Sequence, residues 1–127
     1  MASEMQLVGG VSETIAQALF LKNGFSVATT VVPEPYDLIV YGKDLQGISH
    51  PFTVQVKTIF TRRDRDNYLV VKGSGSDGRP YSKKDVDYIL GVHQATSTGY
   101  LIENNEQTEY WTKNLETAEE KWTKYEL

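Results

Sequence analysis

Apolar residues near the start of the chain recur at steps of three and four positions, which is the period of one helix face. Ser3 and Gln6 precede this pattern with the spacing of a capping box, and Asn23-Gly24-Phe25 follows it with a glycine stop and a hydrophobic residue. Gly9-Gly10 disfavours the first turns by about 1 kcal/mol per glycine relative to alanine, so the stable helix is expected to begin near Val11. The expected apolar stripe consists of Val8, Val11, Ile15, Ala18 and Leu19.

Farther along the chain, short runs rich in β-branched and aromatic residues alternate with glycines, prolines and polar residues. The runs 36–41 and 52–58 are separated by a loop marked by Gly42, Gly47 and Pro51, which predicts an antiparallel hairpin, and Ile59-Phe60 extends its second strand. Residues 25–32 are expected to form a strand or an extended approach to the hairpin, further strands are expected at 68–71, 87–93 and 99–103, and a short helix at 115–122. The pattern predicts an α/β fold: a mixed β-sheet of about five strands with an N-terminal helix and a short C-terminal helix, in one domain spanning 1–127.

The polar residues of this hairpin are candidates for chemistry. Side chains alternate between the two faces of a strand, so Val54 and Val56 are expected to point into a core while Gln55 and Lys57 share the other face, about 7 Å apart. Asp37 on the preceding strand could face this amide and this ammonium. The alternative is that Gln55 and Lys57 form a plain solvent face and that Asp37 belongs to a turn after two prolines. Aspartate is depleted within strands, yet Asp37 is followed at once by apolar residues, which favours a position in the strand or at its mouth.

The segments Pro35-Tyr36-Asp37 and Gln55-Val56-Lys57 resemble the motif of the PD-(D/E)xK nuclease superfamily, with Gln55 where the motif usually has Glu or Asp. Within that superfamily the chain is similar to small intron-encoded homing endonucleases and short phage-type endonucleases, some of which carry glutamine at this position. The resemblance covers roughly residues 5–111 as an order of elements and implies a restriction-endonuclease-like fold. In these nucleases the N-terminal helix commonly bears a glutamate that reaches the metal site, and Glu13 occupies the matching place; otherwise Glu13 is a glutamate on a surface helix.

The resemblance implies a metal-dependent DNA endonuclease that hydrolyses phosphodiester bonds with Mg²⁺, for which Mn²⁺ could substitute. Such hydrolysis requires an activated water and neutralisation of the phosphoryl charge, and Mg²⁺ takes oxygen ligands. The implied ligands are the carboxylates of Asp37 and Glu13, the side-chain amide of Gln55 and the backbone carbonyl of Val56. Lys57 would orient the attacking water or stabilise the transition state. Because Gln55 is neutral, the metal affinity is expected to be weaker than with an acid there.

The charge of the 127-residue chain is −4 in total but unevenly distributed. From Lys57 to Lys84 there are eight basic and three acidic residues. A positive stretch that begins at the candidate catalytic lysine suits an enzyme that approaches a phosphate backbone. The alternative is that these charges balance others across the folded surface. The candidate DNA contacts are Arg62, Arg63, Arg65, Lys72, Arg79, Lys83 and Lys84.

The chain has no cysteine and two histidines, which argues against disulfide bonds and a zinc centre. No apolar run approaches the roughly 18 residues of a membrane span, and the N-terminus lacks the pattern of a signal peptide. We therefore expect an intracellular, cytoplasmic protein with no membrane partner. One small domain offers one active site whereas a duplex has two strands, so a homodimer or homotetramer that acts on DNA is expected.

Two other functions stay open. In the first, Gln55 marks the loss of catalysis, and the chain is a DNA-binding module of the same fold that does not cut. In the second, the chain is a small protein-interaction domain of a mobile element or phage, which binds a partner through the acidic C-terminal helix at 115–122. Salt dependence separates these functions, because DNA binding weakens steeply as the salt concentration rises.

Overall fold

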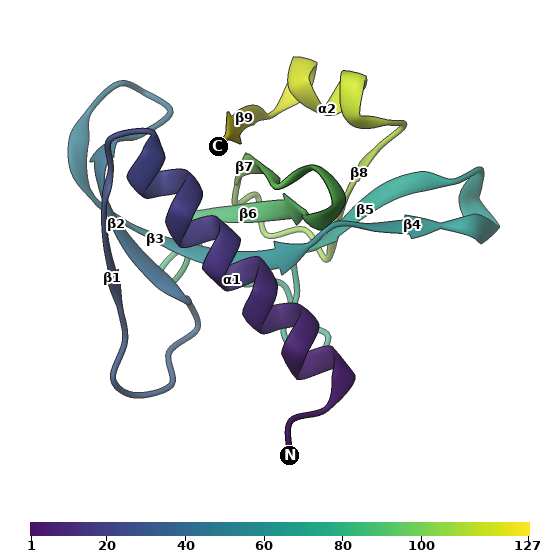
Figure 1. The fold of residues 1–127 in the computed structure, drawn as a ribbon, viewed down its shortest axis with the longest axis horizontal. Coiled ribbons are helices and arrows are strands. Elements are labelled where there is room, and N and C mark those ends of the chain that lie inside the picture. Colours follow the sequence, from purple (N-terminus) through teal and green to yellow (C-terminus); the bar gives the residue numbers. More distant parts are fainter.

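The computed structural model describes residues 1–127, and Figure 1 shows the course of the chain. The long helix α1 (Glu4–Lys22) comes first and lies across one face of a β-sheet (Figure 1). The strands of the first half are β1 (Ser26–Thr29), β2 (Leu38–Lys43), β3 (Ser49–Thr58), β4 (Phe60–Arg62) and β5 (Tyr68–Lys72), with the 3₁₀ turn η1 (Arg63–Arg65) between the last two. The second half contains β6 (Tyr88–His93), η2 (Gln94–Thr96), β7 (Thr98–Glu103), β8 (Glu109–Thr112), α2 (Leu115–Lys121) and β9 (Thr123–Glu126).

The start of α1 is fixed by the expected capping box. The backbone N–H of Gln6 donates to Ser3 Oγ at 3.2 Å, and the backbone N–H of Ser3 donates to Gln6 Oε1 at 2.9 Å. The helix therefore begins at Glu4, and the expectation that it begins near Val11 is wrong. Two satisfied N-terminal donors offset the low helix propensity of Gly9-Gly10.

The end of α1 is a Schellman motif, as the glycine stop predicts. Gly24 has a φ of +89°, the left-handed conformation that glycine adopts without strain. The backbone N–H of Phe25 donates to the carbonyl of Phe20 at 2.9 Å, and that of Gly24 donates to Leu21 at 3.1 Å. The rings of Phe20 and Phe25 pack edge to face with centroids 5.4 Å apart, so the chain turns back into the sheet at a fixed angle.

The face of α1 that packs on the sheet differs from the expected stripe. Ser12 and Ala16 are buried on this face together with Leu19 and Phe20, whereas Val8 is 39% and Val11 49% exposed. Small side chains let the helix approach the strands closely, and Ser12 is satisfied there by a 2.6 Å hydrogen bond with Thr58 Oγ1. The helix is thus rotated about its own axis relative to the prediction, and this rotation brings Glu13 next to the packed face.

The large sheet has six strands in the order β1-β2-β3-β6-β7-β9. The pair β3–β6 is parallel and the other neighbours are antiparallel, so the sheet is mixed as predicted. The hairpin of β2 and β3 is confirmed, with Leu38 opposite Val54. Strand β9 pairs with β7 at the edge and was not expected from the sequence, which explains six strands in place of about five.

A second sheet of three strands has the order β4-β5-β8. At Ile59 the chain passes from β3 directly into β4, so residues 59–60 leave the first sheet instead of extending it. The backbone N–H of Ile59 still donates to the Val92 carbonyl of β6 at 2.8 Å, which ties the start of the second sheet to the first. A continuous backbone therefore links the candidate catalytic strand β3 to the hairpin of β4 and β5.

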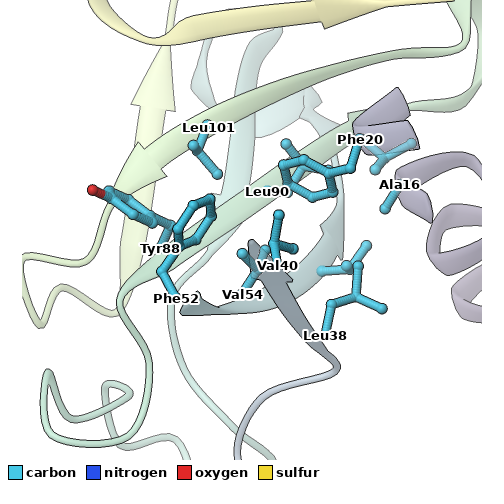
Figure 2. Packing of buried hydrophobic residues seen from close by; sticks show 11 residues of the cluster. Ala16, Phe20, Leu38, Val40, Phe52, Val54, Tyr88, Leu90 and Leu101 are labelled. Carbon is cyan, nitrogen blue, oxygen red and sulfur yellow. The ribbon is translucent and has the colours of Figure 1, made fainter. Parts of the chain in front are cut away.

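The large sheet is buried on both faces. On one face, α1 covers a cluster that Figure 2 shows around Val54, Leu90 and Phe20. On the other face, residues of the second sheet and of α2 cover Ile89 and Tyr100. The central strand β6 contributes to both clusters, which matches its nearly continuous apolar sequence.

The C-terminal helix α2 is confirmed and belongs to the face opposite α1. Asn114 caps it through a side-chain bond from the Thr117 N–H at 2.9 Å, and Ala118 is its buried contact. Neither α1 nor α2 combines the length and the apolar composition that a bilayer crossing by a helix requires.

Candidate active site

Asp37 lies immediately before β2, at the mouth of the strand. Its backbone N–H donates to the Val54 carbonyl at 3.0 Å, and its carboxylate accepts the Val56 N–H at 2.9 Å. Because the N–H and C=O of one strand residue point to the same side, the Val56 carbonyl also faces this side of β3. The carboxylate thus lies at the edge of β3 where β2 begins, beside a backbone oxygen.

Glu13 approaches Asp37 from α1. Burial raises the pKa of Glu13, and the nearby charge of Asp37 raises it further. Burial also raises the pKa of Asp37, while the Val56 N–H and the ammonium of Lys57 lower it in part. Both carboxylates are partly buried, and the charge of Asp37 disfavours ionisation of Glu13; a cation between them would relieve this repulsion.

Lys57 lies on the opposite face of the sheet from Val54 and Val56, and the half-buried Gln55 shares its face, as the alternation predicts. The Lys57 ammonium donates to the Ser74 carbonyl at 3.3 Å and lies 5.2 Å from the centre of the Tyr81 ring. These contacts come from the loop between β5 and β6. Sequence reasoning missed Ser74 and Tyr81; the only signal was that a glycine-rich loop ends in an aromatic residue.

The donor set at Asp37 fits a divalent cation that prefers oxygen. The groups near it are two carboxylates, one just before β2 and one on α1, and the backbone carbonyl of Val56 on β3; Gln55 precedes Val56 in the same strand and carries a neutral amide. No group of three or more His, Cys, Asp or Glu side chains is arranged to hold a metal ion. A bound metal would therefore depend on neutral oxygens, water and substrate for the remainder of its ligands.

A groove of about 490 Å³ runs between the first three turns of α1 and the end of β3. Val56, Lys57 and Thr58 line one wall, and Val8 and Gly9 lie on the other. A side chain at Gly9 would meet no atom within 4 Å, so the glycine leaves this wall open. Part of a substrate can therefore reach the end of β3 from this side.

The predicted DNA contacts lie in three places. Arg62, Arg63, Arg65 and Lys72 belong to the hairpin of β4 and β5; Arg79 lies in the loop that holds Lys57; Lys83 and Lys84 precede β6. Arg62 donates to the carboxylate of Asp64 at 2.8 Å and to Glu109 at 3.4 Å, which raises the pKa of the guanidinium and lowers that of Asp64 to about 2. All except Arg62 are exposed.

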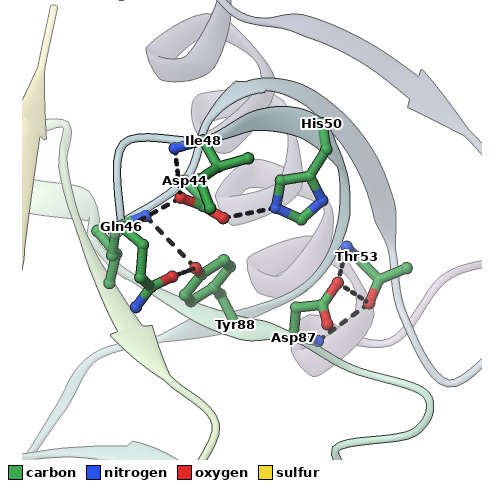
Figure 3. A network of polar contacts seen from close by, with 8 residues as sticks. Asp44, Gln46, Ile48, His50, Thr53, Asp87 and Tyr88 are labelled. Atoms are coloured by element: carbon green, nitrogen blue, oxygen red, sulfur yellow. Dashed lines mark hydrogen bonds and ion pairs between the residues drawn. The ribbon is translucent and has the colours of Figure 1, made fainter.

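A second polar cluster lies at the far end of β2 (Figure 3). Asp44 accepts hydrogen bonds from the backbone N–H groups of Gln46 and Ile48, both at 2.9 Å, and pairs with His50. The side-chain oxygen of Gln46 in turn accepts a hydrogen bond from the hydroxyl of Tyr88 at 3.2 Å. This network closes the loop between β2 and β3, and its contacts are internal to the fold.

The fold is similar to that of a bacterial homing endonuclease, I-Ssp6803I, with a TM-score of 0.64. The likeness covers 90% of this chain and 78% of the endonuclease chain, at 22% sequence identity. No protein-family profile and no curated protein sequence matches the chain. At this level of identity the likeness shows the fold, and the chemistry has to be argued from the site.

Proposed function

We propose that the chain is a metal-dependent DNA endonuclease. The observation that carries the proposal is the position of Asp37, whose carboxylate lies beside the Val56 carbonyl at the edge of β3; Lys57 is close enough to lower its pKa, and its own charge raises the pKa of Glu13. A carboxylate that only tied β2 to β3 would not need a second, partly buried carboxylate beside it. The likeness of the fold to a homing endonuclease supports DNA as the substrate.

Asp37, Glu13, the Val56 carbonyl and the Gln55 amide are the groups that would hold the metal. When bound, Mg²⁺ or Mn²⁺ would neutralise charge on the phosphoryl group and lower the pKa of a water molecule. The carboxylates supply negative charge from two sides, and the Val56 N–H keeps Asp37 in one orientation. Because Gln55 contributes no charge, Glu13 is a more important ligand than in a site with three acids.

Lys57 is proposed to bind the scissile phosphate or the attacking water. Its ammonium has three N–H donors, and the Ser74 carbonyl accepts one of them. The Tyr81 ring restricts the remaining freedom of the side chain. The other donors can then stabilise the negative charge that develops on the phosphoryl oxygens.

The proposed enzyme acts as a homo-oligomer, because cleavage of both DNA strands takes two sites. The first half of α1 supports this proposal, since Leu7 and Val11 are exposed there and do not line the groove beside β3. No charged residue lies between Glu4 and Glu13, so a second copy can pack on this face without like-charge repulsion. Val11→Lys is expected to convert the oligomer to monomers in sedimentation experiments, while Leu21→Lys, near the other end of α1, leaves it intact.

The second candidate is the DNA-binding module that does not cut. The neutral Gln55 and the lack of a third acid favour it. Gln55→Glu separates the two candidates. If the native chain is an active enzyme, this variant lowers the metal concentration needed for half-maximal cleavage. If the native chain is an inactive module, it does not cut DNA at any metal concentration, and only the variant with the added carboxylate is expected to cut.

The proposal is tested by plasmid cleavage with Mg²⁺, Mn²⁺ or EDTA. The native chain is compared with Asp37→Asn and Lys57→Ala, after circular dichroism has shown equal fold content. Cleavage that needs metal and is lost in both variants supports the proposal. A folded native chain that cuts no DNA with either metal contradicts it, and cleavage that survives both substitutions places the activity elsewhere.

A further inference from the structure

The hairpin of β4 and β5 projects from the body of the molecule (Figure 1). Its tip is a narrow turn in which Asp66 and Asn67 have φ values of 52° and 59°. Between Phe60 and Lys72 the hairpin has four basic and two acidic residues, in a chain whose net charge is −4. It is thus the part of the surface where arginines are most concentrated.

We infer that this hairpin binds duplex DNA in the major groove and that Trp111 holds its arginines in position. The inference rests on the proposed function and goes further by naming the element that reads the DNA. The major groove admits a two-stranded β-ribbon, and arginine pairs with the O6 and N7 atoms of guanine there. Neither the helix α1 nor the acidic helix α2 offers a comparable set of cations.

Trp111 of β8 lies opposite Val70 in the second sheet. The guanidinium of Arg62 lies 5.5 Å from the centre of the Trp111 ring and that of Arg65 lies 5.0 Å from it. Tyr68 adds a second aromatic ring with its centroid 6.4 Å from that of Trp111. Stacking on an aromatic face attracts a guanidinium and restricts its rotamers, so binding costs less side-chain entropy.

The arginines of the hairpin have different surroundings. Arg62 uses its donors on Asp64 and Glu109, so it braces the hairpin against β8. Arg63 and Arg65 are exposed and form none of the ion pairs of the structure. These two guanidiniums are therefore the ones available to base edges and phosphates.

The hairpin is also placed at a defined distance from the candidate active site. Arg65 lies eight positions after Lys57, which span at most about 27 Å in an extended chain. At about 3.4 Å per base pair, the contacts of the hairpin fall within about eight base pairs of the scissile phosphate. The backbone link between β3 and β4 keeps this offset constant.

The test is fluorescence anisotropy of the full chain with a mixed-sequence DNA duplex in EDTA, so that cleavage does not interfere. Arg63→Gln and Arg65→Gln are each expected to weaken binding about 5- to 100-fold. Each is also expected to reduce the slope of log affinity against log salt by about one. Lys22→Gln makes the same charge change at the far end of α1 and should leave affinity and slope unchanged.

Trp111 is a positioning residue, and its test includes rescue by an aromatic residue. Trp111→Leu is expected to weaken binding about 2- to 5-fold while Trp111→Phe restores most of it. In single-turnover cleavage, Trp111→Leu should raise the DNA concentration needed for half-saturation and leave the maximal rate unchanged. Methylation of guanine N7 should interfere with binding within about eight base pairs of the cut.

The inference is overturned if Arg63→Gln and Arg65→Gln bind like the native chain while the native chain binds and cuts DNA; the proposed function then stands. If the arginine variants lose binding but the native chain does not cut, the inference stands and the function is that of a DNA-binding module. A native chain with no salt-dependent DNA binding contradicts both the inference and the proposed function.

Discussion

Two aspartates flank the same strand and have opposite surroundings. Asp37 precedes β2 and Asp44 follows it. Asp44 accepts hydrogen bonds from two backbone N–H groups and contacts His50, which together lower its pKa (Figure 3). Asp37 accepts one backbone bond from Val56, and burial raises its pKa beside a second carboxylate.

The difference separates a structural carboxylate from a candidate functional one. The charge of Asp44 is stabilised by donors within its own loop, so its ionisation favours the fold. The charge of Asp37 is poorly compensated, so the fold tolerates it at a cost in stability. Groups that catalyse or bind ions are often found in this second condition. The predictions below test the contrast, from the largest expected effect to the smallest.

Asp37→Asn should have the largest effect, and it should fall on activity. The amide oxygen keeps the bond from Val56 but removes a charged ligand, so metal-dependent cleavage is expected to fall by at least about 100-fold. The free energy of unfolding in EDTA should stay equal or rise, because the charge removed is one that burial disfavours. Plasmid cleavage and denaturant unfolding measure the two effects. A variant that unfolds early and keeps its cleavage rate would contradict the contrast.

Asp44→Asn should lower the stability of the fold and leave the cleavage activity unchanged. The loop between β2 and β3 loses charge-assisted bonds, so the unfolding midpoint should fall while cleavage by the folded fraction stays at the native rate. The control is Asp85→Asn, a substitution of the same kind at an exposed carboxylate that forms none of the ion pairs of the structure. Loss of cleavage at full stability would give Asp44 a functional role that the structure does not support.

The effect of Asp44 should depend on pH. Its pKa in the folded chain lies below the ordinary value of 3.8, so the folded state binds fewer protons than the unfolded state in this range. The stabilisation is therefore complete above pH 3.8 and is lost as the pH falls toward the pKa of the folded state. Thermal unfolding of the native chain and of Asp44→Asn should differ most above pH 4 and converge in acid. A difference between the two unfolding midpoints that grows as the pH falls would contradict a lowered pKa of Asp44 in the folded chain.

Tyr88→Phe tests the same network from β6. The hydroxyl donates to Gln46 and accepts the Leu45 N–H, so its loss should cost about 1 kcal/mol of unfolding free energy. Cleavage should not change. Tyr110→Phe would be a poor control, because that hydroxyl also accepts backbone bonds; Tyr41→Phe, on an exposed side chain, is the better one.

Tyr81→Leu should have the smallest effect. Like Asp37→Asn, it is expected to lower the rate of cleavage. Removing the ring beside Lys57 loses a cation–π contact of about 0.5–1 kcal/mol, which corresponds to a 2- to 5-fold lower cleavage rate. Tyr81→Phe retains the ring and should cleave at the native rate. Equal rates in both variants would show that the ring does not position Lys57.

Much of the first sheet could be predicted from the sequence because its signals are local. The capping box at Ser3, the glycine stop at Gly24 and the alternation around Val54 each involve residues close together in the chain, and each is confirmed. The position of Asp37 at the mouth of β2 follows from the same pattern. The roles of Glu13, Gln55 and Lys57 stay predictions.

The features of the fold that the sequence did not predict depend on contacts between residues that are distant in the chain. The prediction of the buried face of α1 was wrong because Val8 and Val11 carry the apolar periodicity, while the small Ser12 and Ala16 determine how closely the helix can pack. The strands β8 and β9 are short, and they form by pairing with β5 and β7 that come earlier in the chain. The stacking of arginines on Trp111 has no sequence signal at all.

The most direct test of the contrast is the thermal unfolding midpoint as a function of Mn²⁺ concentration. A ligand that binds only the folded state raises the midpoint, by mass action. Mn²⁺ should raise the midpoints of the native chain and of Asp44→Asn and leave that of Asp37→Asn unchanged. A native chain that does not respond to Mn²⁺, or an Asp37→Asn variant that responds as strongly as the native chain, would contradict the assignment of Asp37 as the metal-binding carboxylate.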